Sequence, residues 1–215
     1  MLLHNLHTHN YTEATNVLEL VNQYPWDFDE TIPVYSVGIH PWYINEVRLE
    51  SDFQMLEKIV QIKSCFAVGE CGLDKRIAIP LDLQIVVFEK QIALAEYYKK
   101  PLVLHLVAAF DELVEIKKRL KVSVPMVIHG FSKNLTVANQ LVSNGFYLSF
   151  GKHLVSNPDL KNVISSIPID RLFLETDTSD CTLDAIYDMV ANFREMPLND
   201  LKHQIMANWN RVFNQ

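Results

Sequence analysis

The stretch "PLVLH", residues 101–105, decides the fold. Leu102, Val103 and Leu104 form an unbroken apolar run that ends in a histidine. A strand covered on one face alternates apolar and polar residues, whereas an unbroken run is typical of a strand buried on both faces. Amphipathic segments at 81–99 and 109–121 flank this run and indicate helices. A doubly buried strand between two helices is the repeating unit of an α/β protein.

The same alternation of strands and helices continues along the whole chain. We predict strands over Leu2–His7, Val34–Ile39, Cys65–Glu70, Leu102–His105, Met126–His129, Phe146–Phe150 and Leu172–Glu175. We predict helices over Asp52–Lys63, Leu81–Lys99, Ala109–Lys121, Leu135–Asn144, Asp159–Ser165 and Leu183–Phe193, and a last helix that starts near Asn199. No linker or internal repeat interrupts the pattern, so we expect one domain over residues 1–215.

Regular alternation in a domain of this size leaves two architectures, a doubly wound open sheet and a TIM-type (β/α) barrel. The first predicted strand is not followed by the glycine-rich loop that cradles phosphates in dinucleotide-binding open sheets. We therefore predict an α/β fold of the TIM-type barrel. Because only seven strands stand out in the sequence, we expect the eighth strand to be short or irregular.

Composition narrows the class of protein further. Hydrophobic residues make up 49% and charged residues 21%, as in ordinary globular proteins. We find no apolar run long enough to cross a bilayer, and "MLLHNLHTHN" lacks the features of a signal peptide. The three cysteines form no paired pattern, which is typical of reduced thiols. We expect a cytoplasmic protein without a membrane partner, and its oligomeric state stays open.

The net charge of −7 argues against an extended nucleic-acid surface, since proteins that coat nucleic acid neutralise phosphates with a basic face. The longest basic cluster is "KKRLK" at 117–121, which is typical of a solvated helix end. A nucleic-acid substrate would have to be held locally, by metals and a few side chains.

Polar residues close six of the seven predicted strands. The closing groups are His7-Thr8-His9, His40, Glu70, His105, His129 and Glu175-Thr176-Asp177. The carboxyl ends of all strands of a barrel meet at one mouth, where active sites are built. We therefore expect these scattered imidazoles and carboxylates to be gathered in space.

The spacing His7-x-His9 places both imidazoles on the same face of a strand, where they can reach one ion. Imidazole nitrogens and carboxylate oxygens suit zinc, manganese, iron or a similar divalent metal. Four histidines and two carboxylates suit two ions that share a bridging carboxylate. A structural role is the competing interpretation, and we keep it for His4, His153 and His203. Trp26 and Trp42 are interpreted as packing residues rather than substrate platforms, with lining of the barrel mouth as the alternative for Trp42, which follows His40. Asp74 is interpreted as a turn residue.

These motifs resemble a known family. "HTH", "GIHPW", "GECGLD", "PLVLH", "IHGFS", "GFYLSFG" and "LETDTSD" stand in the order and spacing of TatD-type metal-dependent hydrolases. The resemblance covers residues 4 to about 180, and the closing "NWNRVF" resembles the family's last helix. It implies a TIM barrel and a metal-dependent hydrolase described as a deoxyribonuclease. Carried over by position, His7, His9 and Asp177 match ligands of one metal, His105 and His129 match ligands of a second, and Glu70 matches the bridging carboxylate.

Four positions depart from the family pattern. Asn5 stands where an aspartate is common, Trp42 where a histidine is common, and Val107 where an arginine is usual. The proline that usually follows the aspartate of "ETD" is also missing. Valine cannot contact an anion as arginine does. Lys75, Arg76, Lys133 and Lys152 follow strand ends and are candidates for that contact.

We predict hydrolysis of a phosphoester, a phosphodiester of DNA above all, with two divalent ions such as Zn²⁺, Mn²⁺ or Mg²⁺. Asp177 would orient or deprotonate the attacking water, and Glu70 would bridge the ions. A second hypothesis keeps the metals and changes the bond to an amide, lactone or other small-molecule ester. A third is a barrel that binds a ligand without catalysis, against which the complete set of predicted ligands argues.

Overall fold

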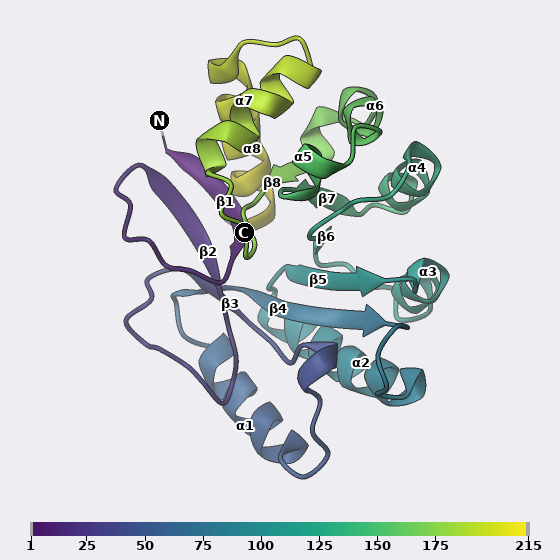
Figure 1. Ribbon diagram of the computed structural model, residues 1–215. Helices are drawn as coiled ribbons and strands as arrows, with labels where there is room; N and C mark the ends of the chain where they lie inside the picture. The colour runs from purple at the N-terminus through teal and green to yellow at the C-terminus, as the bar shows by residue number, and fades with distance from the viewer. Residues whose placement is uncertain (1, 214–215) are drawn as a thin grey trace. The chain divides into compact units, whose positions relative to one another are not determined.

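The computed structural model describes residues 2–213, which contain eight strands (Figure 1). The chain divides into two compact units, one of residues 1–20 with 127–215 and one of residues 21–126. Each unit carries parallel strands with helices packed against them. No helix within 2–213 is both long and apolar enough to cross a bilayer.

The unit of residues 21–126 contains the end of β2 (Val17–Gln23), then β3 (Tyr35–Val37), β4 (Cys65–Asp74) and β5 (Leu102–Val107). Each strand pairs in parallel with the next, as Val21 with Tyr35 and Gly72 with His105 show. The helices are η1 (Pro41–Tyr43), α1 (Leu49–Val60), α2 (Leu81–Tyr98) and α3 (Phe110–Arg119). Parallel strands with connecting helices are the arrangement that buries both faces of a sheet.

Helix α2 shows how this unit is fixed. Its apolar residues Phe88, Ile92 and Ala95 follow the helical spacing, and all are buried. Two buried glutamines lie on the same helix. Gln91 donates to and accepts from the backbone of Ile39, and Gln84 accepts from the Asp74 amide at 2.8 Å. The helix therefore holds the chain where it leaves β3 and β4.

The other unit contains β1 (Leu3–Thr8), β6 (Met126–Ile128, from Val127 on), β7 (Tyr147–Phe150) and β8 (Leu172–Leu174). Val127 pairs in parallel with Tyr147, Leu148 with Leu172, and Thr8 bridges to Asp177. Its helices are α4 (Leu135–Ser143), α5 (His153–Ser156), α6 (Leu160–Ser166), η2 (Ile169–Arg171), α7 (Leu183–Phe193) and α8 (Leu198–Phe213). Helices α7 and α8 pack against β1, where the Tyr187 hydroxyl bonds to the His4 backbone.

The strand that the sequence did not reveal is β2, "VLELVNQ", which has seven residues. The expectation of a short or irregular eighth strand is wrong, because β2 is longer than β3, β6 or β8. Its last residues, Asn22 and Gln23, are polar but buried, so the run does not read as an apolar strand. The four-residue helix α5 was not predicted either. The short 3-10 helices η1 and η2 were not predicted, whereas the remaining helices begin and end close to the predicted positions.

Strand β4 continues past its predicted end at Glu70 to Asp74. The residue that makes this possible is Gly72, whose φ of +138° is rarely adopted by residues with a side chain. A Cβ at Gly72 would overlap the carbonyl oxygen of His105 on β5. Glycine therefore lets the two strands approach at the residues that carry the polar groups described below.

We expect Gly72→Ala to lower the free energy of unfolding by about 1–3 kcal/mol, because it adds backbone strain and a clash with β5. Urea unfolding of the two proteins measures the difference. Gly145→Ala is the control, since Gly145 also has positive φ (+81°) but lies in the turn before β7. A Gly72→Ala protein as stable as the parent would contradict the role of this close approach.

Candidate metal centre

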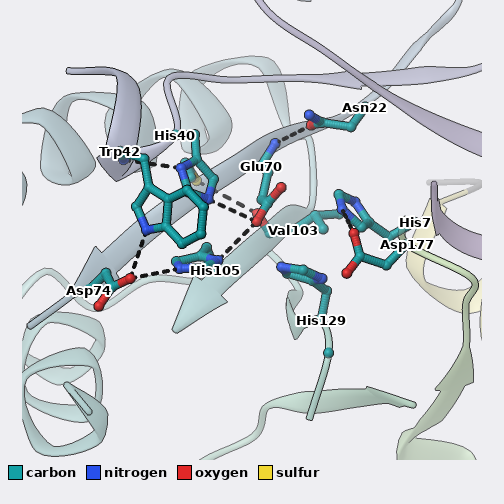
Figure 2. Close-up of polar contacts among 12 residues, drawn as sticks. His7, Asn22, His40, Trp42, Glu70, Asp74, Val103, His105, His129 and Asp177 are labelled. Atoms are coloured by element: carbon teal, nitrogen blue, oxygen red, sulfur yellow. Dashed lines mark hydrogen bonds and ion pairs between the residues drawn. The ribbon is translucent and has the colours of Figure 1, made fainter. Parts of the chain in front are cut away.

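The unit of residues 21–126 gathers His40, Glu70 and His105 (Figure 2). Their potential ligand atoms lie within 4.8 Å of one another. Glu70 Oε1 is 3.0 Å from His40 Nε2 and 3.0 Å from His105 Nδ1. Glu70 is only 4% exposed, so its carboxylate depends on these partners rather than on water.

Three elements position this group. Glu70 lies within β4, and its backbone N–H donates to Asn22 Oδ1 at the end of β2 at 2.7 Å. His105 lies on the adjoining β5. His40 follows β3 and precedes η1, and its Nδ1 accepts a hydrogen bond of 3.0 Å from the Trp42 backbone N–H. His40 was seen in the sequence as a strand-end residue but was not predicted as part of the site.

The hydrogen bonds separate the roles of the two imidazoles. A neutral imidazole has one donor and one acceptor nitrogen. Because Nδ1 of His40 accepts from Trp42, Nε2 is the nitrogen that donates to Glu70. His40 is therefore suited to hold the carboxylate, and His105 is better suited to bind a cation.

Asp74 contacts the ring nitrogen of His105 that does not face Glu70. Asp74 Oδ2 is 3.3 Å from His105 Nε2 and accepts a 2.7 Å hydrogen bond from Trp42 Nε1, while Oδ1 accepts from the Arg76 backbone. Burial would raise the pKa of Asp74, but these hydrogen bonds outweigh it and lower the pKa below its ordinary value. The interpretation of Asp74 as a turn residue misses this role, because β4 was expected to end at Glu70.

The other unit gathers His7, His129 and Asp177, whose ligand atoms also lie within 4.8 Å of one another. Asp177 Oδ1 is 3.7 Å from His7 Nε2 and 3.6 Å from His9 Nε2. The rings of His7 and His129 are 4.3 Å apart, and His7 is fully buried. The structure thus brings together the predicted pair His7 and His9 and the predicted carboxylate Asp177.

Backbone pairing between β1 and the segment after β8 creates this proximity. The Asp177 amide donates to the His7 carbonyl at 2.9 Å, with Asp177 at a φ of +54°. Asn5 and Thr176 exchange two hydrogen bonds, at 2.8 and 3.0 Å. Asparagine at position 5 therefore ties the first strand to the "ETD" segment.

Glu175 is a further carboxylate that sequence reasoning left without a role. It is 1% exposed, and its Oε1 accepts from the Gly130 amide at 2.7 Å and lies 3.4 Å from His129 Nδ1. This contact fixes the ring of His129, as Asp74 fixes the ring of His105. The only signal in the sequence was its place at a strand end.

Lys152 brings a positive charge to the cluster of His7, His129 and Asp177. Its Nζ bonds to Asp177 Oδ2 at 2.6 Å. Burial would raise the pKa of Asp177, but the electrostatic interaction with His7 and the hydrogen bond from Lys152 hold it below its ordinary value. Lys75, another candidate for anion binding, is instead paired with Glu112.

An α/β fold with groups of carboxylates and imidazoles that could hold divalent ions is typical of a metal-dependent hydrolase. Residues 3–214 match the TatD related DNase family. The chain is 28% identical over 218 residues to the "Uncharacterized metal-dependent hydrolase YabD" of Bacillus subtilis, covering 93% of this chain and 82% of that protein. It is 27% identical over 227 residues to the "3'-5' ssDNA/RNA exonuclease TatD" of Edwardsiella piscicida, covering 95% and 85%.

Among solved structures, YjjV, a TatD homolog from Escherichia coli K12, is similar with a TM-score of 0.84 and 21% identity. The similarity covers 100% of this chain and 98% of YjjV, and it confirms the predicted (β/α) barrel fold. The chain belongs to the TatD related DNase family, as the motifs indicated. It is an enzyme, a metal-dependent hydrolase that acts on ester bonds.

We expect Asp74→Asn to weaken metal binding or activity about 10- to 100-fold, because a neutral amide no longer fixes the proton on His105 Nε2. Isothermal titration with Mn²⁺ or Zn²⁺ measures the affinity. Asp82→Asn, in the first turn of α2, is the matched control for loss of one carboxylate in the same unit. Equal affinities in Asp74→Asn and the parent would exclude the positioning role.

Proposed function

We propose that this chain hydrolyses phosphodiester bonds of DNA with two divalent metal ions. The observation that carries the proposal is the presence, in each unit, of buried or partly buried carboxylate and imidazole donors within 4.8 Å of one another. We assign His7, His9 and Asp177 to one ion, His105 and His129 to the second, and Glu70 to both. The family match over residues 3–214 supports this assignment across the two units and supports treating them as one domain.

The donor set fits a divalent cation for a chemical reason. His105 lies between two carboxylates, with Nδ1 facing Glu70 and Nε2 facing Asp74. A neutral ring donates to only one of them, so the other nitrogen presents a lone pair toward a carboxylate. His105 Nδ1 and Glu70 would hold a cation that satisfies both groups, while Nε2 would donate to Asp74. A carboxylate behind a ligating imidazole is the usual arrangement in metal sites.

When bound, two divalent ions lower the pKa of a water and offset the charge that develops on phosphoryl oxygens. The chain's own groups complete the site. Asp177 is ionised at neutral pH because its pKa lies below its ordinary value, and as a carboxylate it can accept a hydrogen bond from the attacking water. We assign it to orient this water and to take up its proton. His40 holds Glu70 through the bond from Nε2. We assign to Lys152 the contact with the phosphate, a role that Val107 cannot have.

The substrate class follows from charge and from relatives. A relative is named as an exonuclease of single-stranded DNA and RNA, which supports a nucleic-acid substrate. The net charge of −7 favours a substrate held locally at the site. We also infer a cytoplasmic location, because Cys65, Cys71 and Cys181 are all free thiols. The second candidate is an amide, lactone or small-molecule ester, which Val107 favours because it cannot hold an anion.

Asp177→Asn should lower kcat on a single-stranded oligodeoxynucleotide about 10²- to 10⁴-fold, because the amide cannot accept the proton. Asparagine tolerates the left-handed backbone at this position, so the change leaves the local fold intact. Assays with Mg²⁺, Mn²⁺ or Zn²⁺ added to chelator-treated protein measure turnover. Asp180→Asn, an exposed carboxylate in the same loop, is the control.

The dependence of activity on added metal ions tests the proposed function directly. Without added ions the chelator-treated parent should be inactive and should melt at a lower temperature, since a bound ligand stabilises the folded state. Cleavage of small amides or lactones but of no phosphoester, with any of the three ions, would replace the phosphodiester assignment by the second candidate. Full activity of Asp177→Asn would remove the proposed role of Asp177.

Lys152→Gln should raise KM for an anionic phosphodiester and leave KM for an uncharged ester unchanged, because only the phosphate needs the cation. Steady-state kinetics on both substrates gives the comparison. Lys161→Gln, on helix α6, removes a lysine from the same unit as a control. A parallel rise of KM for both substrates would show that Lys152 acts through the structure around Asp177 instead.

A further inference from the structure

We propose that Trp42 is a stacking platform for an unpaired nucleobase of the substrate. This inference deepens the proposed function and rests on it. Trp42 is 53% exposed although it belongs to η1, directly after the site residue His40. Its ring centroid lies 5.2 Å from the ring of His40 and 5.5 Å from the ring of His105. A large exposed aromatic side chain therefore adjoins the group that contains Glu70.

Both N–H groups of Trp42 donate to residues of the site. The indole Nε1 donates to Asp74 Oδ2 at 2.7 Å, and the backbone N–H donates to His40 Nδ1 at 3.0 Å (Figure 2). What remains exposed is apolar ring surface with no hydrogen bond to offer. A ring already held in one orientation loses little rotamer entropy when a ligand stacks on it. Packing alone, as expected from the sequence, does not account for this exposure.

Other aromatic residues brace the segment that carries Trp42. Tyr43 packs edge-on against Tyr24 and Trp26, with centroids 5.3 and 6.1 Å apart, and Tyr24 stacks on Trp26 at 5.1 Å. The Arg48 guanidinium lies over Trp26 at 3.7 Å from the ring centroid. Tyr43 is itself 45% exposed. Contacts between aromatic rings thus hold the segment after β3 in place.

The net charge of the chain favours a nucleobase as the group that stacks on Trp42. A chain of net charge −7 with Val107 in place of an arginine has little cationic surface with which to hold a polynucleotide. Stacking needs no cation, and every base offers a π-face, so one aromatic ring binds single strands with little sequence preference. Bases of a duplex are covered by their neighbours, so the platform selects unpaired nucleotides.

The test compares a single-stranded oligodeoxynucleotide with copies that carry an abasic residue at each position in turn. The parent should cleave the intact strand with a kcat/KM about 5- to 150-fold higher than the most sensitive abasic copy, the range expected for one stacked base. Trp42→Leu should bring this ratio close to one, because leucine is apolar but has no π-face. Trp42→Phe should keep most of the ratio, because a flat ring remains.

The ratio separates stacking from a merely structural effect. Loss of the indole bond to Asp74 would lower cleavage of intact and abasic strands alike and leave the ratio unchanged. Tyr97→Leu, on α2, is the control, since Tyr97 is 78% exposed. An unchanged ratio in Trp42→Leu would overturn the stacking proposal and leave the proposed function standing. Failure of the parent to cleave any strand would overturn both.

Discussion

The constraint on which the rest of the structure depends is the burial of two carboxylates, Glu70 and Asp177. Each is less than a tenth exposed. A charge removed from water is costly unless other charges or hydrogen bonds replace the water. Glu70 meets this need with two imidazoles and Asp177 with imidazoles and Lys152. In each group the histidines lie close to the carboxylate, which needs charged or hydrogen-bonding partners in place of water.

The same supporting device occurs in both units. Asp74 contacts Nε2 of His105, and Glu175 contacts Nδ1 of His129. Both carboxylates are buried. Backbone amides hold these carboxylates in turn, from Arg76 in one case and Gly130 in the other. The backbone thus holds each carboxylate, and the carboxylate in turn orients the imidazole ring. Such supporting contacts keep the geometry of a metal site.

The sequence alone was enough to predict those site residues that follow a clearly apolar strand. His7 and His9 stand two residues apart at the end of a strand, and Asp177 follows a plainly apolar strand, so we could predict that the three would lie together at the carboxyl ends of their strands. Strand β2 was not, because Asn22 and Gln23 are polar residues buried for their hydrogen bonds. Nor were the roles of Asp74 and His40, since one depends on Gly72 extending a strand and the other on a bond to the backbone of Trp42. Such contacts join segments that no periodicity connects.

The hydrogen bonds between Asn5 and Thr176 have a consequence for biosynthesis. They join residues separated by 171 positions, and the pairing of His7 with Asp177 spans a similar length. Contacts of such sequence separation form late, because a long loop must close first. During synthesis Asn5 of β1 is made 171 residues before Thr176, so their hydrogen bonds must wait until the segment of Thr176 has been made. The cluster of His7, His129 and Asp177 therefore assembles only after the segment that carries Asp177 has been made.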